Sequence, residues 1–288
     1  MDNILELQQI SKTFPKSNFT LDKVSFSLPY GAIMGFVGEN GAGKTTTIGC
    51  ILNTIIKDGG TVKLFGQEML DENTDVREKI GVVYDGDNFP AYWTAQTVSK
   101  VMAGLYAGWD APLFQKYLED FQLPASQKIK HYSRGMTMKL AIAAALSHHP
   151  QLLILDEATS GLDPVMRDEM LDVFLEFVQE EDHSILLSSH ITNDLEKVAD
   201  YITFIHQGKL MMTVSKNDLA YRYGIMRCRE EQFLALEPGD VLAWRKRDYQ
   251  IDVLVSDGKK AEQKYKGAVV DHASIDEMLL LLAKGEGR

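Results

Sequence analysis

Residues 38–46 read Gly-Glu-Asn-Gly-Ala-Gly-Lys-Thr-Thr, and this stretch decides the fold. It fits the phosphate-loop pattern G-x-x-x-x-G-K-[ST], with Gly38, Gly43, Lys44 and Thr45 at the fixed positions. Glycines let the backbone bend so that several N–H groups point at phosphate oxygens, and the following helix adds its positive N-terminal end. A chance glycine-rich turn is the alternative, and the flanking segments decide against it.

The segments on either side of the loop have the character that a phosphate loop requires. Residues 32–37 form a short apolar run typical of a buried strand, and residues 46–52 continue as a helix. In this arrangement the charge of Lys44 can reach the outer phosphates, and the hydroxyl of Thr45 can bind Mg²⁺. We expect the other loop residues to surround the same ligand; they are Glu39, Asn40, Gly41, Ala42 and Thr46.

A pair of acidic residues follows a second apolar run. Residues 152–155 are all Leu or Ile and end in Asp156 and Glu157, which is typical of a strand buried on both faces. Ligands of open α/β sheets bind at the carboxyl ends of the strands. We therefore expect Asp156 to hold Mg²⁺ and Glu157 to orient or deprotonate a water. A helix cap is the alternative function for such a pair.

Composition limits the possible classes of protein. The 288 residues include 45% apolar and 25% charged residues, which is ordinary for a globular chain with a full core. The net charge of −11 disfavours a broad nucleic-acid-binding surface. Cys50 and Cys228 lie far apart and have neither metal nor disulfide spacing. No signal peptide is recognisable, and no uninterrupted apolar run approaches the length of a membrane span.

The pattern along the chain changes twice. Short strands dominate residues 3–85, and residues 86–150 read as helices, for example 97–106, 111–121 and 138–147. Strands return at 151–155, 184–188 and 201–205, and a hairpin turn at 206–209 follows. Beyond residue 216, strands at 225–229, 240–245 and 249–255 and a final helix at 274–284 indicate a small appended domain.

Further motifs follow the phosphate loop in the order that one family shows. Tyr132-Ser133-Arg134-Gly135-Met136 resembles the signature L-S-G-G-Q, Ser160-Gly161-Leu162-Asp163 resembles the D-loop, and Ser188-Ser189-His190 resembles the switch histidine. The resemblance that these motifs support, together with the loop and the acidic pair, extends over about residues 3–215. On these motifs the chain resembles the ATP-binding subunit of an ABC transporter.

The resemblance implies an α/β fold of the P-loop NTPase type. It would have a mixed core sheet with flanking helices, an antiparallel N-terminal sheet and a helical subdomain at about 86–150, within a domain at 1–216. A small α+β accessory domain would occupy 217–288. The implied function is MgATP hydrolysis that powers export of a peptide, antibiotic or lipid, as in two-component exporters; phenol-soluble-modulin exporters are a narrower possibility. The implied partners are a separate membrane permease and a second ATPase subunit, identical or paralogous, with no nucleic acid. The implied location is cytoplasmic, on the inner face of the cell membrane.

The resemblance also assigns site residues. Ser133 and Gly135 of the signature would meet the nucleotide of a partner subunit in a head-to-tail dimer, and Asp163 of the D-loop would also contribute to nucleotide binding. His190 would contact the γ-phosphate, although a lone histidine is more often structural. Phe14 would stack on adenine, with core packing as the alternative.

Two positions depart from the family pattern. Asp85 stands where the family has a glutamine that reaches the metal, and we expect it to be a Mg²⁺ ligand. Arg134 replaces a signature glycine and is expected to contact phosphate or the partner subunit.

Two other functions fit the nucleotide motifs. One is an ATPase that acts on ribosomes or DNA, but such family members typically carry two nucleotide domains or long coiled coils. The other is a scaffold that binds nucleotide without hydrolysis, and Glu157 argues against it.

Overall fold

A six-stranded sheet forms the centre of the molecule in a computed structural model that describes residues 2–70 and 73–287. Its order is β10-β9-β3-β8-β7-β6. The pairs β3–β8, β3–β9, β7–β8 and β6–β7 are parallel, and β10 is antiparallel to β9. The strands are β3 (Ile33–Val37), β6 (Ile80–Val83), β7 (Leu152–Asp156), β8 (Ser184–Ser189), β9 (Tyr201–His206) and β10 (Lys209–Ser215).

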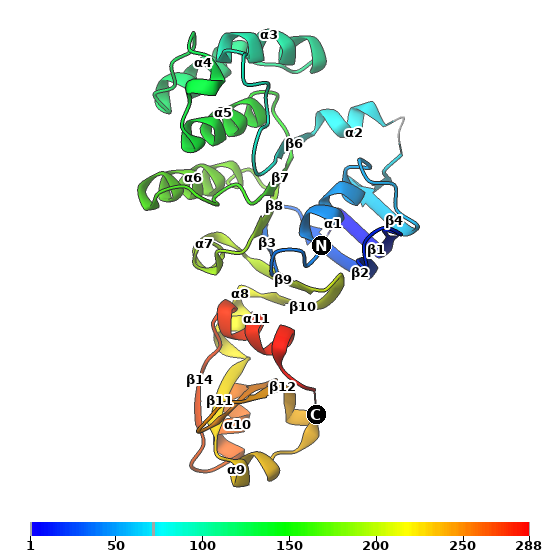
Figure 1. The fold of residues 1–288 in the computed structure, drawn as a ribbon, viewed down its shortest axis with the longest axis vertical. Coiled ribbons are helices and arrows are strands. Elements are labelled where there is room, and N and C mark those ends of the chain that lie inside the picture. Colours follow the sequence, from blue (N-terminus) through cyan, green and yellow to red (C-terminus); the bar gives the residue numbers. More distant parts are fainter. Residues whose placement is uncertain (1, 71–72, 288) are drawn as a thin grey trace.

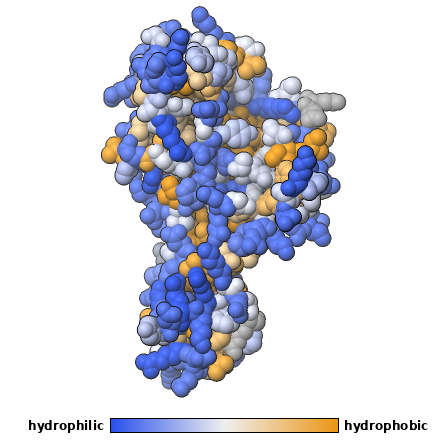
Figure 2. Space-filling model, in the orientation of Figure 1, coloured by the Kyte–Doolittle hydropathy of each residue, from blue (hydrophilic) through white to orange (hydrophobic). Residues whose placement is uncertain are grey.

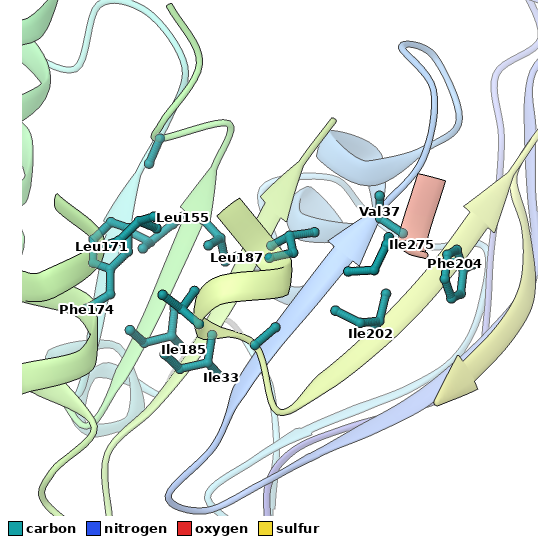
Figure 3. Close-up of a cluster of buried hydrophobic side chains, with 14 of the residues drawn as sticks. Ile33, Val37, Leu155, Leu171, Phe174, Ile185, Leu187, Ile202, Phe204 and Ile275 are labelled. Atoms are coloured by element: carbon teal, nitrogen blue, oxygen red, sulfur yellow. The ribbon is translucent and has the colours of Figure 1, made fainter. Parts of the chain in front are cut away.

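Apolar side chains cover both faces of this sheet. Ile33 and Val37 of β3 point to the face where Phe174 packs, whereas Met34 and Phe36 belong to the cluster on the opposite face. All five side chains have no exposed surface. Figure 3 shows the first of these clusters, with Leu155, Ile185 and Leu187 between the strands and the helices. Burial on both faces explains why these strands read as continuous apolar runs.

An antiparallel sheet of order β2-β1-β4-β5 packs on the second face. It consists of β1 (Asn3–Thr13), β2 (Thr20–Pro29), β4 (Gly59–Leu64) and β5 (Gln67–Glu68). Helix α1 (Lys44–Ile51) contributes Ile48 and Ile51 to the same core. The mixed core sheet and the antiparallel N-terminal sheet are as the family resemblance implies.

Helices occupy the middle of the chain, and those over residues 95–146 lie at one end of the molecule (Figure 1). They are α2 (Thr74–Glu78), α3 (Ala95–Leu105), α4 (Ala111–Asp120), the 3₁₀ turn η1 (Ile129–His131) and α5 (Arg134–Leu146). Val98, Phe114 and Leu140 bring α3, α4 and α5 together in a core of their own. Helices α6 (Pro164–Phe177) and α7 (Thr192–Val198) belong to the first face of the central sheet.

A third sheet, of order β12-β13-β11-β14, lies at the opposite end from α3–α5 (Figure 1). Its strands are antiparallel. The segment contains α8 (Lys216–Tyr221), β11 (Gly224–Cys228), α9 (Glu230–Leu234), η2 (Pro238–Asp240), β12 (Val241–Lys246), β13 (Ile251–Val255), α10 (Gly258–Lys264), β14 (Val269–His272) and α11 (Ile275–Lys284). The sequence predicts β11, β12, β13 and α11, but not β14 or the short helices.

Helix α11 joins this lobe to the central sheet. Its buried residues Ile275, Met278 and Leu281 belong to the cluster that contains Leu195 of α7 and Ile202 of β9. The backbone N–H of Ile275 also donates to Glu196 Oε1 at 3.1 Å. The apolar face of α11 therefore packs both on its own sheet and on the main core, across the narrowing that Figure 2 shows.

None of the helices within 2–70 and 73–287 is long and apolar enough to cross a membrane. Most of the face shown in Figure 2 is hydrophilic.

The packing of α11 between the C-terminal sheet and the main core, here called the seam, leads to a prediction about stability. Ile275→Ala should lower the unfolding free energy by about 2–4 kcal/mol, because the side chain is fully buried and deletion leaves a cavity. Denaturant unfolding measures the change. Val269→Ala, at a side chain that is 60% exposed on β14, is the control and should change little. A loss as small as that of the control would mean that the seam contributes no stability.

His148 is a buried histidine at the end of α5. Its ring stacks on Tyr106 with centroids 4.1 Å apart, and Nε2 lies 3.2 Å from the Ile80 carbonyl. Burial lowers the pKa of His148 below its ordinary value, with a smaller contribution from neighbouring His149, while the Ile80 contact and the charge of Glu78 act in the opposite direction. The folded chain therefore resists protonation at this site.

Acid should therefore destabilise the fold through His148. Below an ordinary pKa of about 6.5, the unfolded chain takes up a proton that native His148 does not, so the unfolding free energy falls as the pH falls. Between about pH 7.5 and about pH 5.5, the loss should be smaller in His148→Gln than in the wild type. Exposed His149→Gln is the control. An equal pH dependence in wild type and His148→Gln would contradict the assignment.

Candidate functional site

The phosphate loop lies between β3 and α1 and has the backbone that its glycines permit. Gly41 and Gly43 have φ values of 80° and 115°, which side-chain-bearing residues rarely adopt. At Gly38 the constraint is space, because a Cβ atom would lie 2.4 Å from the Ile205 carbonyl oxygen. The three glycines thus allow the loop to curl over the end of the sheet.

Lys44 begins α1 and is turned inward over this loop. Only 6% of the residue is exposed. Its Nζ donates to the Gly38 carbonyl at 2.7 Å and lies 3.1 Å from Glu157 Oε1. The ammonium group is thereby held where the loop closes, with a carboxylate as its counterion.

Thr45 and Asp156 form the second contact between the loop and the acidic strand. Thr45 Oγ1 donates to Asp156 Oδ2 at 2.7 Å, and Ser188 Oγ donates to Asp156 Oδ1 at 2.5 Å. Asp156 is 4% exposed, so both carboxylate oxygens are satisfied inside the protein. The hydroxyl and the carboxylate together offer the hard oxygen ligands that Mg²⁺ prefers.

Glu157 leaves the strand with a φ of 54°, a left-handed conformation for a residue with a side chain. Its N–H donates to the Ser188 carbonyl at 3.1 Å. Its Oε2 lies 2.5 Å from His190 Nδ1, so Glu157 contacts both Lys44 and His190. The glutamate side chain is 12% exposed and that of the histidine 43%, which leaves the imidazole accessible to a ligand.

A cavity of about 630 Å³ opens over these groups. Predicted site residues that line it are Asn40, Gly41, Gly43, Lys44, Thr45, Thr46, Asp85, Asp156 and Glu157. Phe19 and Tyr84 complete the lining. The structure thus brings together, from separate segments, the phosphate loop and the acidic residues.

The aromatic residue at this cavity is Phe19. Its ring lies against the loop, since a Cβ at Gly43 would be 3.0 Å from Phe19 Cζ. Phe14, expected from the sequence to stack on adenine, is not among the described lining residues; its centroid is 6.4 Å from that of Phe19. The two rings therefore form a tilted pair in which Phe19 is nearer the loop.

Ser133, Gly135 and Asp163 lie outside this cavity. Ser133 caps α5 by accepting from the Met136 N–H at 3.2 Å, so the helix begins earlier than the sequence predicts. Asp163 caps α6 by accepting from the N–H groups of Val165 and Met166 at 3.0 Å. Within one chain, the described contacts of Ser133 and Asp163 are those of helix caps.

Asp85 lines the cavity but has a partner of its own. Arg134 Nη2 donates to Asp85 Oδ1 at 2.8 Å. Neighbouring Tyr84 is partly buried, and burial is the main cause that raises the pKa of its phenol, with a further contribution from the charge of Asp156. Tyr84 therefore stays protonated at neutral pH.

The lining can bind and polarise a phosphate ester. Lys44 supplies positive charge, and the loop and α1 supply N–H groups. Glu157 can orient a water; its partner His190 contacts it from outside the described lining. Among the described residues, no group of three or more His, Cys, Asp or Glu side chains could hold a metal ion. Phe19 and Tyr84 are lining residues that sequence reasoning missed. It quoted Ser188 in the switch motif but gave it no role, and the structure shows that Ser188 binds Asp156.

Comparisons with known proteins agree with this geometry. Residues 21–160 match the family model described as ABC transporter. The bacitracin transport ATP-binding protein BcrA of Bacillus licheniformis is 33% identical over 77% of this chain and 73% of its own length. The lantibiotic transport ATP-binding protein SrtF of Streptococcus pyogenes is 33% identical over 73% of this chain and 90% of its own.

A solved structure described as the ATP-binding subunit of an ABC transporter has a similar fold. Its TM-score is 0.68 at 26% sequence identity, with 75% of this chain and 91% of that chain covered. The similarity thus spans most of the chain but not all of it.

Lys44→Ala should weaken ATP binding by about 10- to 100-fold, because it removes the one basic side chain among the described residues of the cavity. Calorimetric titration measures the affinity. Lys139→Ala is a matched control, since Lys139 is also a largely buried lysine that pairs with a glutamate, Glu169, outside the cavity. Unchanged affinity in folded Lys44→Ala would show that the loop does not hold the phosphates.

Proposed function

The chain belongs to the ABC transporter family as an ATP-binding ATPase subunit, and we propose that it powers export of a peptide, antibiotic or lipid through a separate membrane permease. The main observation behind this proposal is that one cavity is lined by Lys44, Thr45, Asp156 and Glu157. Relatives named for bacitracin transport, lantibiotic transport and linearmycin resistance support the substrate class.

Mg²⁺ fits the pair formed by Thr45 and Asp156. The hydroxyl and carboxylate oxygens already lie 2.7 Å apart, and Mg²⁺ is usually held by one or two protein groups together with substrate phosphates. When bound, the ion would neutralise charge on the β- and γ-phosphates. The Ser188 hydroxyl keeps the Asp156 carboxylate oriented toward Thr45.

Glu157 is proposed as the residue that orients or deprotonates the attacking water. Its carboxylate contacts Lys44 at 3.1 Å and His190 at 2.5 Å, so two nitrogen groups fix its orientation. Phosphates that bind Lys44 would compete for the ammonium group and leave Glu157 with His190. The carboxylate would then face the water that attacks the γ-phosphate.

A second subunit is proposed to complete the site. Ser133 and Gly135 lie at the start of α5, where free N–H groups can bind a phosphate, but neither lines the cavity of its own chain. Head-to-tail pairing would bring this helix to the nucleotide of the partner. Bound ATP would then hold the dimer together, and hydrolysis would release it. The partner is an identical chain or a paralogue.

The domain boundary is proposed near residue 216, with a helical subdomain at about 86–150 and an accessory domain at 217–288. The separate β11–β14 sheet supports this division, while α11 links the two parts. We place the subunit in the cytoplasm, on the inner face of the cell membrane, because a permease would recruit it there.

Glu157→Gln should retain ATP binding but lower turnover by about 10²- to 10⁴-fold, because it removes a positioned base. It should also accumulate an ATP-bound dimer. Steady-state phosphate release and sedimentation with MgATP measure the two effects. Turnover close to that of the wild type would remove Glu157 from the mechanism.

Ser133→Arg in the Glu157→Gln background is the control for the dimer. The added side chain should block pairing while leaving the cavity of each chain intact, so ATP binding persists without the dimer. A dimer that forms normally in this double variant would contradict the head-to-tail arrangement.

A further inference from the structure

The two positions that depart from the family pattern contact each other. Asp85 follows β6, and Arg134 is the first residue of α5, 49 positions later. Arg134 Nη2 donates to Asp85 Oδ1 at 2.8 Å. An aspartate in place of glutamine and an arginine in place of glycine thus form a matched pair of opposite charge.

Asp85 stands between two cavities. It lines the phosphate cavity with Lys44 and Thr45, and it also lines a neighbouring cavity of about 460 Å³ together with Arg134. Whatever fixes Asp85 therefore shapes the wall of the phosphate cavity.

The charges in the phosphate cavity explain why Asp85 needs a counterion. Its described lining includes three carboxylates, of Asp85, Asp156 and Glu157, and one basic side chain, of Lys44. Like charges in a partly enclosed site repel more strongly than in water. An unpaired Asp85 would therefore oppose a triphosphate, and the guanidinium of Arg134 offsets its charge.

Arg134 also lies against the segment that leads into α6. A Cβ atom at Gly161 would be 2.6 Å from Arg134 Cζ, and Gly161 has a φ of 71°. The guanidinium therefore occupies space that only a glycine leaves free. It connects the loop after β6, the start of α5 and the loop before α6.

We propose that Arg134 is a positioning residue for the phosphate site: it neutralises Asp85 and fixes the loop after β6 against α5. Asp85 then acts as the partner of Arg134 and not as a metal ligand. This inference rests on the proposed binding of MgATP in the cavity. Both side chains are about half exposed, at 54% and 47%, so the pair contributes little to folding stability. Its effect should appear in nucleotide affinity.

A double-mutant cycle on the full chain tests the proposal, with calorimetric ATP affinity in Mg²⁺ as the measurement. Arg134→Gln should weaken binding about tenfold in the wild-type background, because it leaves Asp85 unpaired. In the Asp85→Asn background the same substitution should weaken binding less than about twofold. Arg134→Lys keeps the charge and should retain most of the affinity.

The matched control is the pair Lys197–Asp168, whose side chains are 59% and 62% exposed and whose charged atoms are 2.6 Å apart. Neutral substitutions of Lys197 and Asp168, alone or together, should leave ATP affinity unchanged. Thermal unfolding of all variants should stay near that of the wild type, which separates positioning from a structural role.

Three results would overturn the proposal. Equal losses from Arg134→Gln in both backgrounds would mean that Arg134 acts on phosphate directly. A higher Mg²⁺ requirement in Asp85→Asn alone would mean that Asp85 is a metal ligand. A wild-type chain that binds no ATP would refute the proposed nucleotide site as well as the pairing. If the wild type binds ATP normally but the effects of the two substitutions on affinity simply add, only the pairing is refuted.

Discussion

The parallel pairing of β3, β8 and β7 is the constraint on which the functional site depends. Parallel strands end at the same edge of a sheet, so the loop after β3 meets the acidic end of β7. Val37 pairs with Ser189, and Asp156 pairs with Ser188. That register lets Ser188 bind Asp156 and brings Thr45 within hydrogen-bond distance of the same carboxylate.

Apolar packing on both faces of the sheet holds this register in place. A shift of one residue along β3 would turn Ile33 and Val37 away from their own cluster and toward the cluster on the opposite face. The packing of both clusters would then be lost. The polar contacts at the strand ends gain from this rigidity, because Lys44 and Glu157 need no reorganisation to meet. The conformational strain at Glu157 is supported by the same rigid neighbours.

Helix α11 joins the C-terminal lobe to this rigid core, because it packs both on its own sheet and on the main core. Ile275 and Met278 of α11 pack with residues of α7, the helix that follows His190. Lys284 at the end of α11 lies 3.6 Å from Glu39 of the phosphate loop. The appended segment therefore reaches the phosphate loop and packs on the main core.

The sequence by itself determined the phosphate loop, the acidic strand end and the strand character of the core, because each depends on residues close together in the chain. It also identified Asp85 and Arg134 as unusual, but not their contact. Only the tertiary structure decided that Phe19 lies nearer the loop than Phe14, and that α11 packs on α7. Strand order and packing between distant segments decide such contacts, and a local pattern carries no information about either.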